Sequence, residues 1–250
     1  MAEKEVDESM EVNIMENAFE ISKAVSSIII DEVKKKPNAV LGFATGASPI
    51  ETYKRMIEAY EKGEVSFKDV ITFNLDEYCD LPKAHPNSFY SFMEENLFSK
   101  VDIAPENINF LDGNTEPVAE SARYARAIKA AGGIDIQLLG IGRNGHIGFN
   151  EPAGEFTDEA FKVRLTDSTI AANSKYFTDI AMPHYAITMG IGSIMRARKI
   201  ILIATGGSKA EAIKATVEGE VTPHCPASIL QKHDDVTLFL DEAAASLLTK

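Results

Sequence analysis

The chain has 250 residues, 45% hydrophobic and 25% charged, a composition typical of a globular protein that buries a large core. Its 38 acidic and 25 basic residues give a formal net charge of −13, which argues against a general binder of nucleic acid or anionic membranes. The N-terminus lacks a secretion-signal pattern, and no apolar run approaches the roughly 20 residues of a membrane helix. Two distant cysteines, Cys79 and Cys225, form neither a disulfide framework nor a metal site, so we expect a cytoplasmic protein.

Helical and strand-like segments alternate along the chain, after an acidic segment over residues 1–10 that we interpret as a solvated tail. Helices are predicted where apolar residues recur three and four positions apart, and strands where short apolar runs end in turn residues. The predicted helices cover residues 16–35, 49–60, 87–98, 116–130 and 208–217. The predicted strands cover residues 39–43, 70–75, 134–139, 185–189, 199–204 and 236–240. This alternation predicts a single α/β domain over residues 11–250, with a mostly parallel open sheet covered by helices on both faces.

The glycine-rich segment 140–152 (GIGRNGHIGFNEP) follows one of these buried strands. Ligands of open α/β sheets bind outside the carboxyl ends of the strands, and glycines let them approach the backbone closely. His146 and Glu151 in this segment form a typical acid/base pair, in which the carboxylate fixes the histidine tautomer. A lone histidine in a glycine loop is more often structural, however, and Asn144-Gly145 is also typical of a simple tight turn.

Two further loops between a strand and a helix could bind an anion. Backbone N–H groups at a helix N-terminus and two hydroxyls would form the first cradle, made of Thr45, Gly46, Ala47 and Ser48. Taken alone, the better interpretation is that Ser48 caps a helix whose first residue is Pro49. The second loop, residues 205–209, offers Lys209 either as a cation for phosphate or as a surface lysine, and its spacing is not that of a P-loop.

Asp76 comes directly after the predicted strand over residues 70–75, in the segment FNLDEY. A carboxylate in this place would be partly desolvated, which raises its pKa and suits a general base. The alternative is that Asp76 and Glu77 begin a turn. We expect no metal and no other cofactor, because the five histidines lack ligand spacing and no CxxC or HxxxH motif is present.

Together these segments resemble the glucosamine-6-phosphate deaminase family, formerly called isomerases, from about residue 10 to residue 248. The combination of FNLDEY with GHIGFNEP is highly specific to these deaminases. The related 6-phosphogluconolactonases share the fold but typically read DGHTASLFP where this chain reads NGHIGFNEP. The segments that carry the resemblance are LGFATGASP (41–49), FNLDEY (73–78), LPKAHPNSFYSFM (81–93), LLGIGRNGHIGFNEP (138–152), TMGIGSIM (188–195) and GGSKAEAI (206–213).

The resemblance implies a Rossmann-like fold and a metal-free isomerisation coupled to loss of ammonia, from D-glucosamine 6-phosphate and water to D-fructose 6-phosphate and ammonium. In the family's mechanism His146 opens the sugar ring and Glu151 orients it. Asp76 then takes the C2 proton and returns it to C1 through an enolamine. The phosphate would rest on residues 45–48, with Lys209 as the counter-charge and Lys175 nearby.

Two positions depart from the family pattern. Asn144 stands where larger members carry aspartate, and it cannot stabilise an imidazolium as a carboxylate would. Shorter members also carry asparagine there, so we interpret Asn144 as part of a variant ring-opening site. Lys175 stands where the family usually has arginine, so it either makes a weaker point contact with phosphate or faces solvent.

A third difference concerns regulation. Phe161 and Val163 occupy positions where larger bacterial members carry the cations of an allosteric site for N-acetylglucosamine 6-phosphate, and the C-terminal extension is missing. We therefore expect no such activation. Residues 153–165, which contain a glycine and several charges, are predicted to form a mobile lid.

Three alternative functions stay open on the sequence alone. The first is deamination of galactosamine 6-phosphate, because the sequence does not show which configuration at C4 of the sugar the site accepts. The second is hydrolysis of 6-phosphogluconolactone, which needs no base for a C2 proton. The third is a non-catalytic sensor of sugar phosphates, for which Asn144 and Lys175 are the only support.

Overall fold

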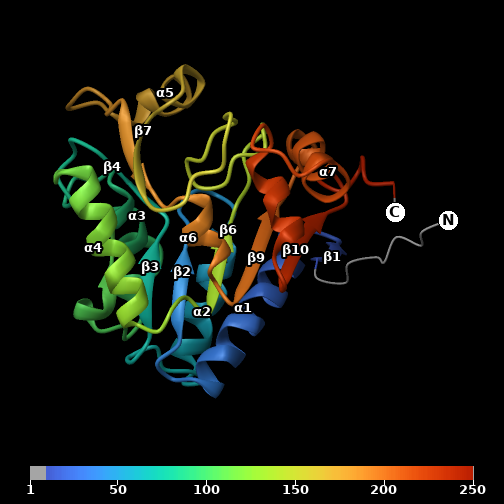
Figure 1. The fold of residues 1–250 in the computed structure, drawn as a ribbon. Coiled ribbons are helices and arrows are strands. Elements are labelled where there is room, and N and C mark those ends of the chain that lie inside the picture. Colours follow the sequence, from blue (N-terminus) through green and yellow to red (C-terminus); the bar gives the residue numbers. More distant parts are fainter. Residues whose placement is uncertain (1–9, 250) are drawn as a thin grey trace.

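A seven-stranded sheet with only parallel pairings forms the centre of the computed structural model, which describes residues 10–249 (Figure 1). The strand order is β1-β10-β9-β6-β2-β3-β5. Residues 1–9 of the predicted tail lie outside the described residues. The strands are β1 (Met10–Met15), β2 (Val40–Phe43), β3 (Ile71–Asn74), β5 (Ile108–Asn109), β6 (Ile136–Leu139), β9 (Lys199–Ala204) and β10 (Val236–Asp241).

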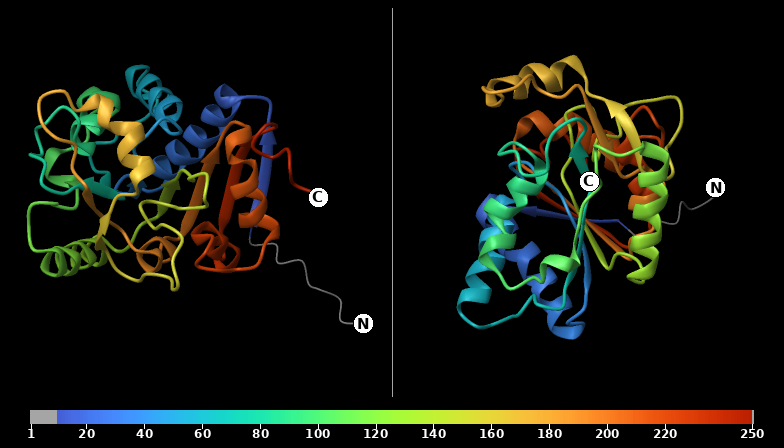
Figure 2. Two further views of the ribbon diagram at one scale, coloured as in Figure 1. Left: turned by 90° about the horizontal axis from the view of Figure 1, so that it is seen from above. Right: turned by 90° about the vertical axis from the view of Figure 1, so that its left-hand side faces the viewer.

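Helices cover both faces of this sheet, so the predicted fold class is confirmed (Figures 1 and 2). One face packs against α1 (Ala18–Lys35), α2 (Ile50–Glu61) and α3 (Phe89–Asn96). The other face packs against α4 (Pro117–Ala130), α6 (Ile191–Met195) and α7 (Ala210–Glu218). Short 3₁₀ turns complete the helical segments: η1 (Phe98–Lys100), η2 (Pro105–Asn107), η3 (Ser174–Tyr176), η4 (Gly207–Lys209) and η5 (Pro226–Lys232).

Local sequence explains where these elements begin and end. Helix α1 starts after Asn17, whose side chain accepts a hydrogen bond from the Glu20 N–H, and it ends in Lys34 and Lys35, which favour the helix C-terminus. Strands β2, β6 and β10 are buried almost throughout, because both faces of a parallel sheet are covered.

The order in which the chain adds strands reverses once, between β2 and β6 at the centre of the sheet. From β2 the chain continues to β3 and β5 on one side, and from β6 it continues to β9 and β10 on the other. Strands β2 and β6 are hydrogen-bonded neighbours. Ligands of open α/β sheets bind at such a switch point, in the crevice at the carboxyl ends of the strands.

The predicted strand over residues 185–189 forms, but it does not belong to the parallel sheet. It is β8 (Tyr185–Thr188), the middle strand of an antiparallel sheet with β4 (Asp76–Tyr78) and β7 (Phe161–Arg164). A short apolar run has the same pattern in either sheet, so the sequence could not separate the two cases. The smaller sheet carries α5 (Asp167–Asn173) and η3 on an arm beyond the main sheet, at the top of Figure 1.

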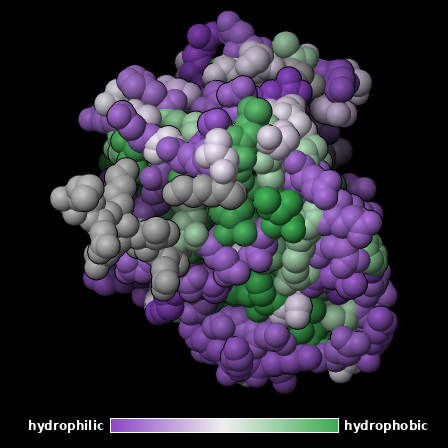
Figure 3. All heavy atoms as spheres, turned by 90° about the vertical axis from the view of Figure 1, so that its right-hand side faces the viewer, coloured by the Kyte–Doolittle hydropathy of each residue, from purple (hydrophilic) through white to green (hydrophobic). Residues whose placement is uncertain are grey.

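Strand β1 was not predicted, and it begins one residue before the expected start of the domain. Met10 pairs with Val236 and continues in register to Met15, which pairs with Asp241. β1 lies at the edge of the sheet and is only partly buried, so its apolar signal is weak. Ile14 and Phe19 remain exposed beside this edge, and Figure 3 shows apolar side chains among polar ones on this side of the molecule.

Residues 153–165 contain more regular structure than a loop. β7 takes up residues 161–164, and the side chains of Asp158 and Glu159 form ion pairs with Arg196 beside α6. Mobility of this segment therefore stays a prediction. Within residues 10–249, no helix has both the length and the apolar character that crossing a membrane requires.

Candidate active site

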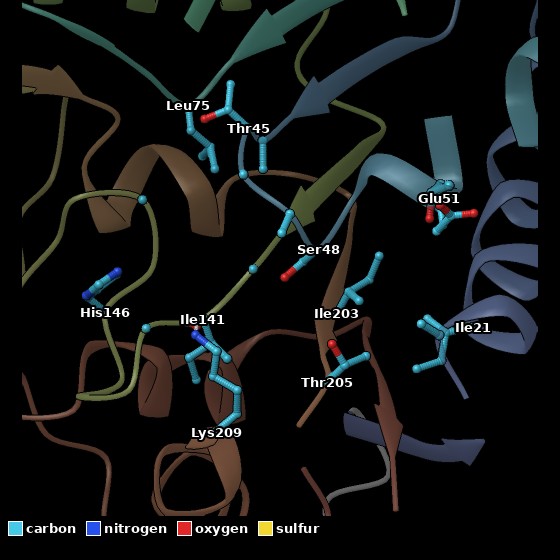
Figure 4. Close-up of a pocket in the computed structure, with 18 of the residues that line it drawn as sticks. Ile21, Thr45, Ser48, Glu51, Leu75, Ile141, His146, Ile203, Thr205 and Lys209 are labelled. Carbon is cyan, nitrogen blue, oxygen red and sulfur yellow. Dashed lines mark hydrogen bonds between the residues drawn. The ribbon is translucent and has the colours of Figure 1, made fainter. Parts of the chain in front are cut away.

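A cavity of about 500 Å³ opens at the carboxyl ends of four neighbouring strands, β9, β6, β2 and β3. All four loops identified in the sequence contribute to its lining. In Figure 4, His146 lies on one side of the cavity and Glu51 on the other, with Ser48, Thr205 and Lys209 between them. The parallel sheet thus brings together residues that are far apart in the chain.

The predicted anion cradle lies between β2 and α2. All of its members line the cavity, namely Thr45, Gly46, Ala47 and Ser48. The capping interpretation of Ser48 is wrong, because α2 begins at Ile50 after Pro49 and no side chain caps its N-terminus. The Ser48 hydroxyl is therefore not used by the helix, and it points toward the centre of the cavity in Figure 4.

Lys209 is the cation of this cavity and is not the surface lysine of the alternative interpretation. The side chain is half-buried, and its Nζ donates a hydrogen bond of 2.6 Å to the carbonyl of Ile141. Burial, and to a smaller extent the charge of Arg143, lower the pKa of Lys209. Its ammonium group is thus held beside the cradle with hydrogen-bonding capacity left for an anionic ligand.

Asp76 is the first residue of β4, directly beyond the end of β3. Its side chain is only 7% exposed and lies at the cavity wall, opposite Thr188 in the antiparallel pairing with β8. Burial, reinforced by the negative charge of Glu77, raises the pKa of Asp76 to about 8. The turn interpretation of Asp76 and Glu77 is wrong, since both residues belong to a strand.

Asn144, His146 and Glu151 form one hydrogen-bonded group in the loop after β6. The Asn144 side chain accepts a hydrogen bond from the His146 N–H at 3.2 Å and donates one to Glu151 Oε2 at 2.6 Å. The other oxygen, Oε1 of Glu151, lies 3.3 Å from Nδ1 of His146, a contact that falls short of hydrogen-bond geometry. Asn144 therefore links both members of the predicted acid/base pair.

The ionisation of Glu151 follows from these neighbours. Burial disfavours its charged form, but the contact with His146 and the hydrogen bond from Asn144 prevail and hold the pKa of Glu151 below its ordinary value. The group therefore carries a carboxylate next to the imidazole at neutral pH. Such a carboxylate can orient the ring and stabilise its protonated form.

Two glycines, which lack a Cβ, make space for the side chains of His146 and Asp76. A Cβ on Gly142 would lie 2.2–2.5 Å from three atoms of the His146 ring, so the imidazole rests directly on the backbone of residue 142. Gly148 has a φ of +57°, and a Cβ there would lie 2.9 Å from Thr188 Oγ1. The backbone of the loop can therefore pass close to both His146 and Asp76.

Three of the proposed site residues do not line the cavity. Asn144 and Glu151 lie next to His146 and reach the cavity only through it, whereas Lys175 is remote from it. Lys175 lies exposed on η3, and its Nζ is 5.0 Å from the ring centroid of Tyr176. The apolar wall of the cavity is not predictable from the sequence pattern. Phe89 of α3 and Phe149 of the histidine loop both line it, with ring centroids 6.1 Å apart and planes inclined by 17°.

Within residues 10–249, no group of three or more His, Cys, Asp or Glu side chains is arranged to hold a metal ion. The cavity offers oxygen, nitrogen and backbone donors suited to an anionic polar ligand. It combines an anion cradle, a buried carboxylate of raised pKa and a histidine–carboxylate pair. This is the equipment of an acid/base enzyme for a small phosphorylated substrate.

Comparison with known proteins agrees with this geometry. Residues 15–239 match the family described as glucosamine-6-phosphate isomerases/6-phosphogluconolactonase. The chain belongs to this family. Within it, a glucosamine-6-phosphate deaminase of Thermoanaerobacter sp. (strain X514) is 48% identical over 241 residues, covering 96% of this chain and 95% of that protein. A glucosamine-6-phosphate deaminase of Mycoplasma mycoides subsp. mycoides SC is 49% identical over 243 residues, covering 96% and 98%.

Solved structures of the glucosamine-6-phosphate isomerase/6-phosphogluconolactonase family share the fold. A monomeric glucosamine-6-phosphate deaminase superposes with a TM-score of 0.90 at 41% identity, covering 95% of this chain and 100% of that one. The 6-phosphogluconolactonase of Leishmania guyanensis superposes with a TM-score of 0.72 at 18% identity, covering 96% and 99%. The resemblance stated from the sequence is confirmed at the level of the family.

The raised pKa of Asp76 predicts a pH-dependent stability. An aspartate of the unfolded chain ionises near pH 4, and Asp76 of the folded chain near pH 8, so the folded state binds its proton more tightly. Asp76 therefore stabilises the fold at low pH, and this contribution is lost as the pH rises from about 4 to 8. Relative to Asp76→Asn, the wild type should lose thermal stability across this range, as calorimetry at several pH values would measure. Parallel pH profiles for the two proteins would contradict the prediction.

The contact between Gly142 and His146 predicts the effect of an added methyl group. Gly142→Ala should displace the imidazole while the fold persists, because the new Cβ would overlap the ring. The His146 ring resonances in an NMR spectrum of the variant should shift. Gly154→Ala is the matched control, since a Cβ there has no heavy atom within 4 Å. Unchanged His146 resonances in Gly142→Ala would show that the ring does not rest on this glycine.

Proposed function

We propose that this protein deaminates D-glucosamine 6-phosphate to D-fructose 6-phosphate and ammonium. The observation that carries the proposal is the single cavity in which the cradle of residues 45–48 and Lys209 faces both Asp76 and His146. A sugar phosphate needs a site for its phosphate and acid/base groups at the other end of the molecule. Relatives about 48% identical over nearly the whole chain are named glucosamine-6-phosphate deaminases, which supports this substrate.

Ring opening is the first chemical step. A proton must leave the hydroxyl at C1 and another must reach the ring oxygen, so that the C1–O5 bond breaks and the C1 aldehyde forms. In our proposal His146 carries this proton, since an imidazole can both accept and donate near neutral pH. Glu151 orients the ring from 3.3 Å, and Asn144 holds Glu151 through its side-chain amide.

Isomerisation then moves a proton from C2 to C1. Asp76 in its ionised form takes the C2 proton, and the C–H electron pair forms the C1–C2 double bond. The π bond of the C1 carbonyl breaks at the same time, and O1 takes up a proton from solvent, which gives an enolamine. The same carboxyl group returns the proton to C1, which leaves an imine at C2. Addition of water to this carbon and departure of the nitrogen as ammonia give the ketone. Burial suits Asp76 to the task, because its raised pKa makes the carboxylate a stronger base.

Phosphate binding is assigned to the cradle of residues 45–48 with the ammonium of Lys209. The backbone N–H groups and hydroxyls of such a loop are donors for phosphate oxygens, and the lysine supplies the opposite charge. A few cationic groups in the cavity suffice for an anionic substrate, although the whole chain has a net charge of −13. Lys175 would reach the phosphate only through a movement of the arm that carries η3.

We also propose that N-acetylglucosamine 6-phosphate does not activate the enzyme. Phe161 and Val163 line a small apolar cavity of about 160 Å³ beside the histidine loop. The described residues that line it include Glu151 and Glu155 but no lysine or arginine. This environment disfavours a sugar phosphate.

The proposed reaction involves no nucleic acid and no membrane. The buried free thiols of Cys79 and Cys225 suit a cytoplasmic enzyme.

The proposal predicts release of ammonia and fructose 6-phosphate from glucosamine 6-phosphate. Asp76→Asn should reduce turnover by roughly 10²-fold or more, because the C2 proton then has no base. Measurement of both products, with galactosamine 6-phosphate assayed in parallel, checks the reaction and the sugar. Turnover of 6-phosphogluconolactone that Asp76→Asn does not impair would favour a lactonase instead. Binding of glucosamine 6-phosphate without ammonia release would favour a sensor.

A further inference from the structure

Glu77, the neighbour of Asp76 in β4, is a buried carboxylate that the proposed mechanism does not use. Its side chain is 5% exposed. It accepts hydrogen bonds from three backbone N–H groups, those of Tyr78 at 2.8 Å, Phe89 at 2.9 Å and Tyr90 at 3.0 Å. Burial raises the pKa of Glu77, and these bonds and the charge of Lys83 oppose that effect. A carboxylate with so many donors is held in one position.

Two of these bonds fix the start of α3. The first N–H groups of a helix have no partner within the helix. In α3, Ser88 accepts from the Ser91 N–H, and Glu77 accepts from the N–H groups of Phe89 and Tyr90. The helix N-terminus in turn favours a negative charge at Glu77. The helix and the strand that carries Asp76 are therefore joined through one side chain.

The residue at the start of α3 is part of the cavity wall. Phe89 packs against Tyr78 with ring centroids 4.5 Å apart and stacks on Phe149 of the histidine loop. A shift of the first turn of α3 would therefore move the apolar surface that lies beside Asp76. This apolar wall and the buried Asp76 carboxylate line the same cavity.

We propose that Glu77 is a positioning residue for the reaction at Asp76. Through α3 it fixes the Phe89 wall of the cavity, and it places a second carboxylate beside that of Asp76. This inference rests on the proposed deaminase function. Glu77 does not touch the substrate in our account, and it acts through Phe89 and Asp76.

The electrostatic part depends on the charges around Glu77. Its neighbours in β4 are Asp76 and Tyr78, and Ile187, its partner in β8, is uncharged. Glu77 also lines a second cavity of about 330 Å³, in which the charged groups are Lys83, Asp112 and Arg123. Arg123 is engaged in an ion pair with Glu120, so Lys83 is the main cation acting on Glu77. The charge of Glu77 adds to burial in making Asp76 a stronger base.

Two substitutions separate the two parts of the proposal. Glu77→Gln keeps the size of the side chain and one acceptor oxygen but removes the charge. Glu77→Asp keeps the charge but shortens the reach to the N–H groups of α3. Glu116→Gln is the matched control, because Glu116 likewise accepts two backbone N–H bonds at the start of α4, away from the cavity. Each protein is assayed for ammonia release from glucosamine 6-phosphate between pH 5 and 9, a range that brackets the pKa of about 8 at Asp76.

The expected results differ between the variants. In Glu77→Gln the acid limb of kcat/KM should move to lower pH, and kcat on the plateau should fall roughly 10-fold, because Asp76 becomes a weaker base. In Glu77→Asp the limb should stay near its wild-type position while KM rises roughly 10-fold, because the Phe89 wall is displaced. Glu116→Gln should leave the pH profile, kcat and KM within about twofold of the wild type, as a surface substitution normally does.

Opposite results would overturn the inference. If Glu77→Gln has the same acid limb and the same kcat as the wild type, the charge of Glu77 has no role. If Glu116→Gln shifts the acid limb as much as Glu77→Gln does, the effect is one of general stability. If Glu77→Gln does not fold, Glu77→Asp and Phe89→Leu provide the test, since both must raise KM. KM values within about twofold of wild type in both would contradict the proposal. Absence of ammonia release from the wild type would instead refute the proposed function itself.

Discussion

The carboxylate of Asp76 is buried where the parallel sheet passes into the small antiparallel one, and the rest of the site is arranged around this costly group. Burial and the charge of Glu77 both favour its neutral form and raise its pKa to about 8. A fold that was selected for stability alone would not retain an unpaired carboxylate in this place. β8, which pairs with β4, and the start of α3 shape the surroundings of this carboxylate. Burial therefore has two effects on Asp76: it lowers the stability of the fold at neutral pH, and it makes the carboxylate a stronger base.

One end of the cavity is suited to binding the phosphate, and the other carries the histidine loop. The reversal of strand order between the parallel strands β2 and β6 places the cradle of residues 45–48 next to the histidine loop. Lys209 joins them, since its ammonium group donates to the carbonyl of Ile141 in that loop. The phosphate would thus anchor the substrate on the same backbone that presents His146. Asn144 links the His146 backbone to Glu151, which is the carboxylate beside the imidazole.

The sequence predicts this site well wherever a side chain follows a strand of the parallel sheet. Asp76, His146 and Lys209 were found in this way, because the carboxyl ends of parallel strands meet at one edge. Lys175 was assigned by resemblance alone, and it lies on the arm beyond the main sheet. Ser48 next to Pro49 has the pattern of a helix cap, but α2 starts one residue later and leaves the hydroxyl for the cavity.

Long-range contacts explain why β8 was assigned to the wrong sheet, why β1 was not predicted, and why some site residues were missed. β8 and β1 depend on partners distant in the chain, Asp76–Tyr78 for the first and Val236–Asp241 for the second, which no local pattern reveals. Glu77 likewise gains its role only when α3 folds back onto β4. Phe89 and Phe149 read as ordinary core residues, since nothing in their spacing shows that they line a cavity. Contacts of this kind are set by tertiary packing, so they become legible only in three dimensions.

The central claim is that Asp76 carries a proton from C2 of the substrate to C1 of the product. The most direct test uses glucosamine 6-phosphate labelled with deuterium at C2, and NMR of the fructose 6-phosphate formed in ordinary water. Our account predicts that part of the deuterium appears at C1, because one buried carboxyl group both removes and returns it, and that Asp76→Asn transfers none. Deuterium at C1 in Asp76→Asn at the wild-type rate would contradict the account and require another base.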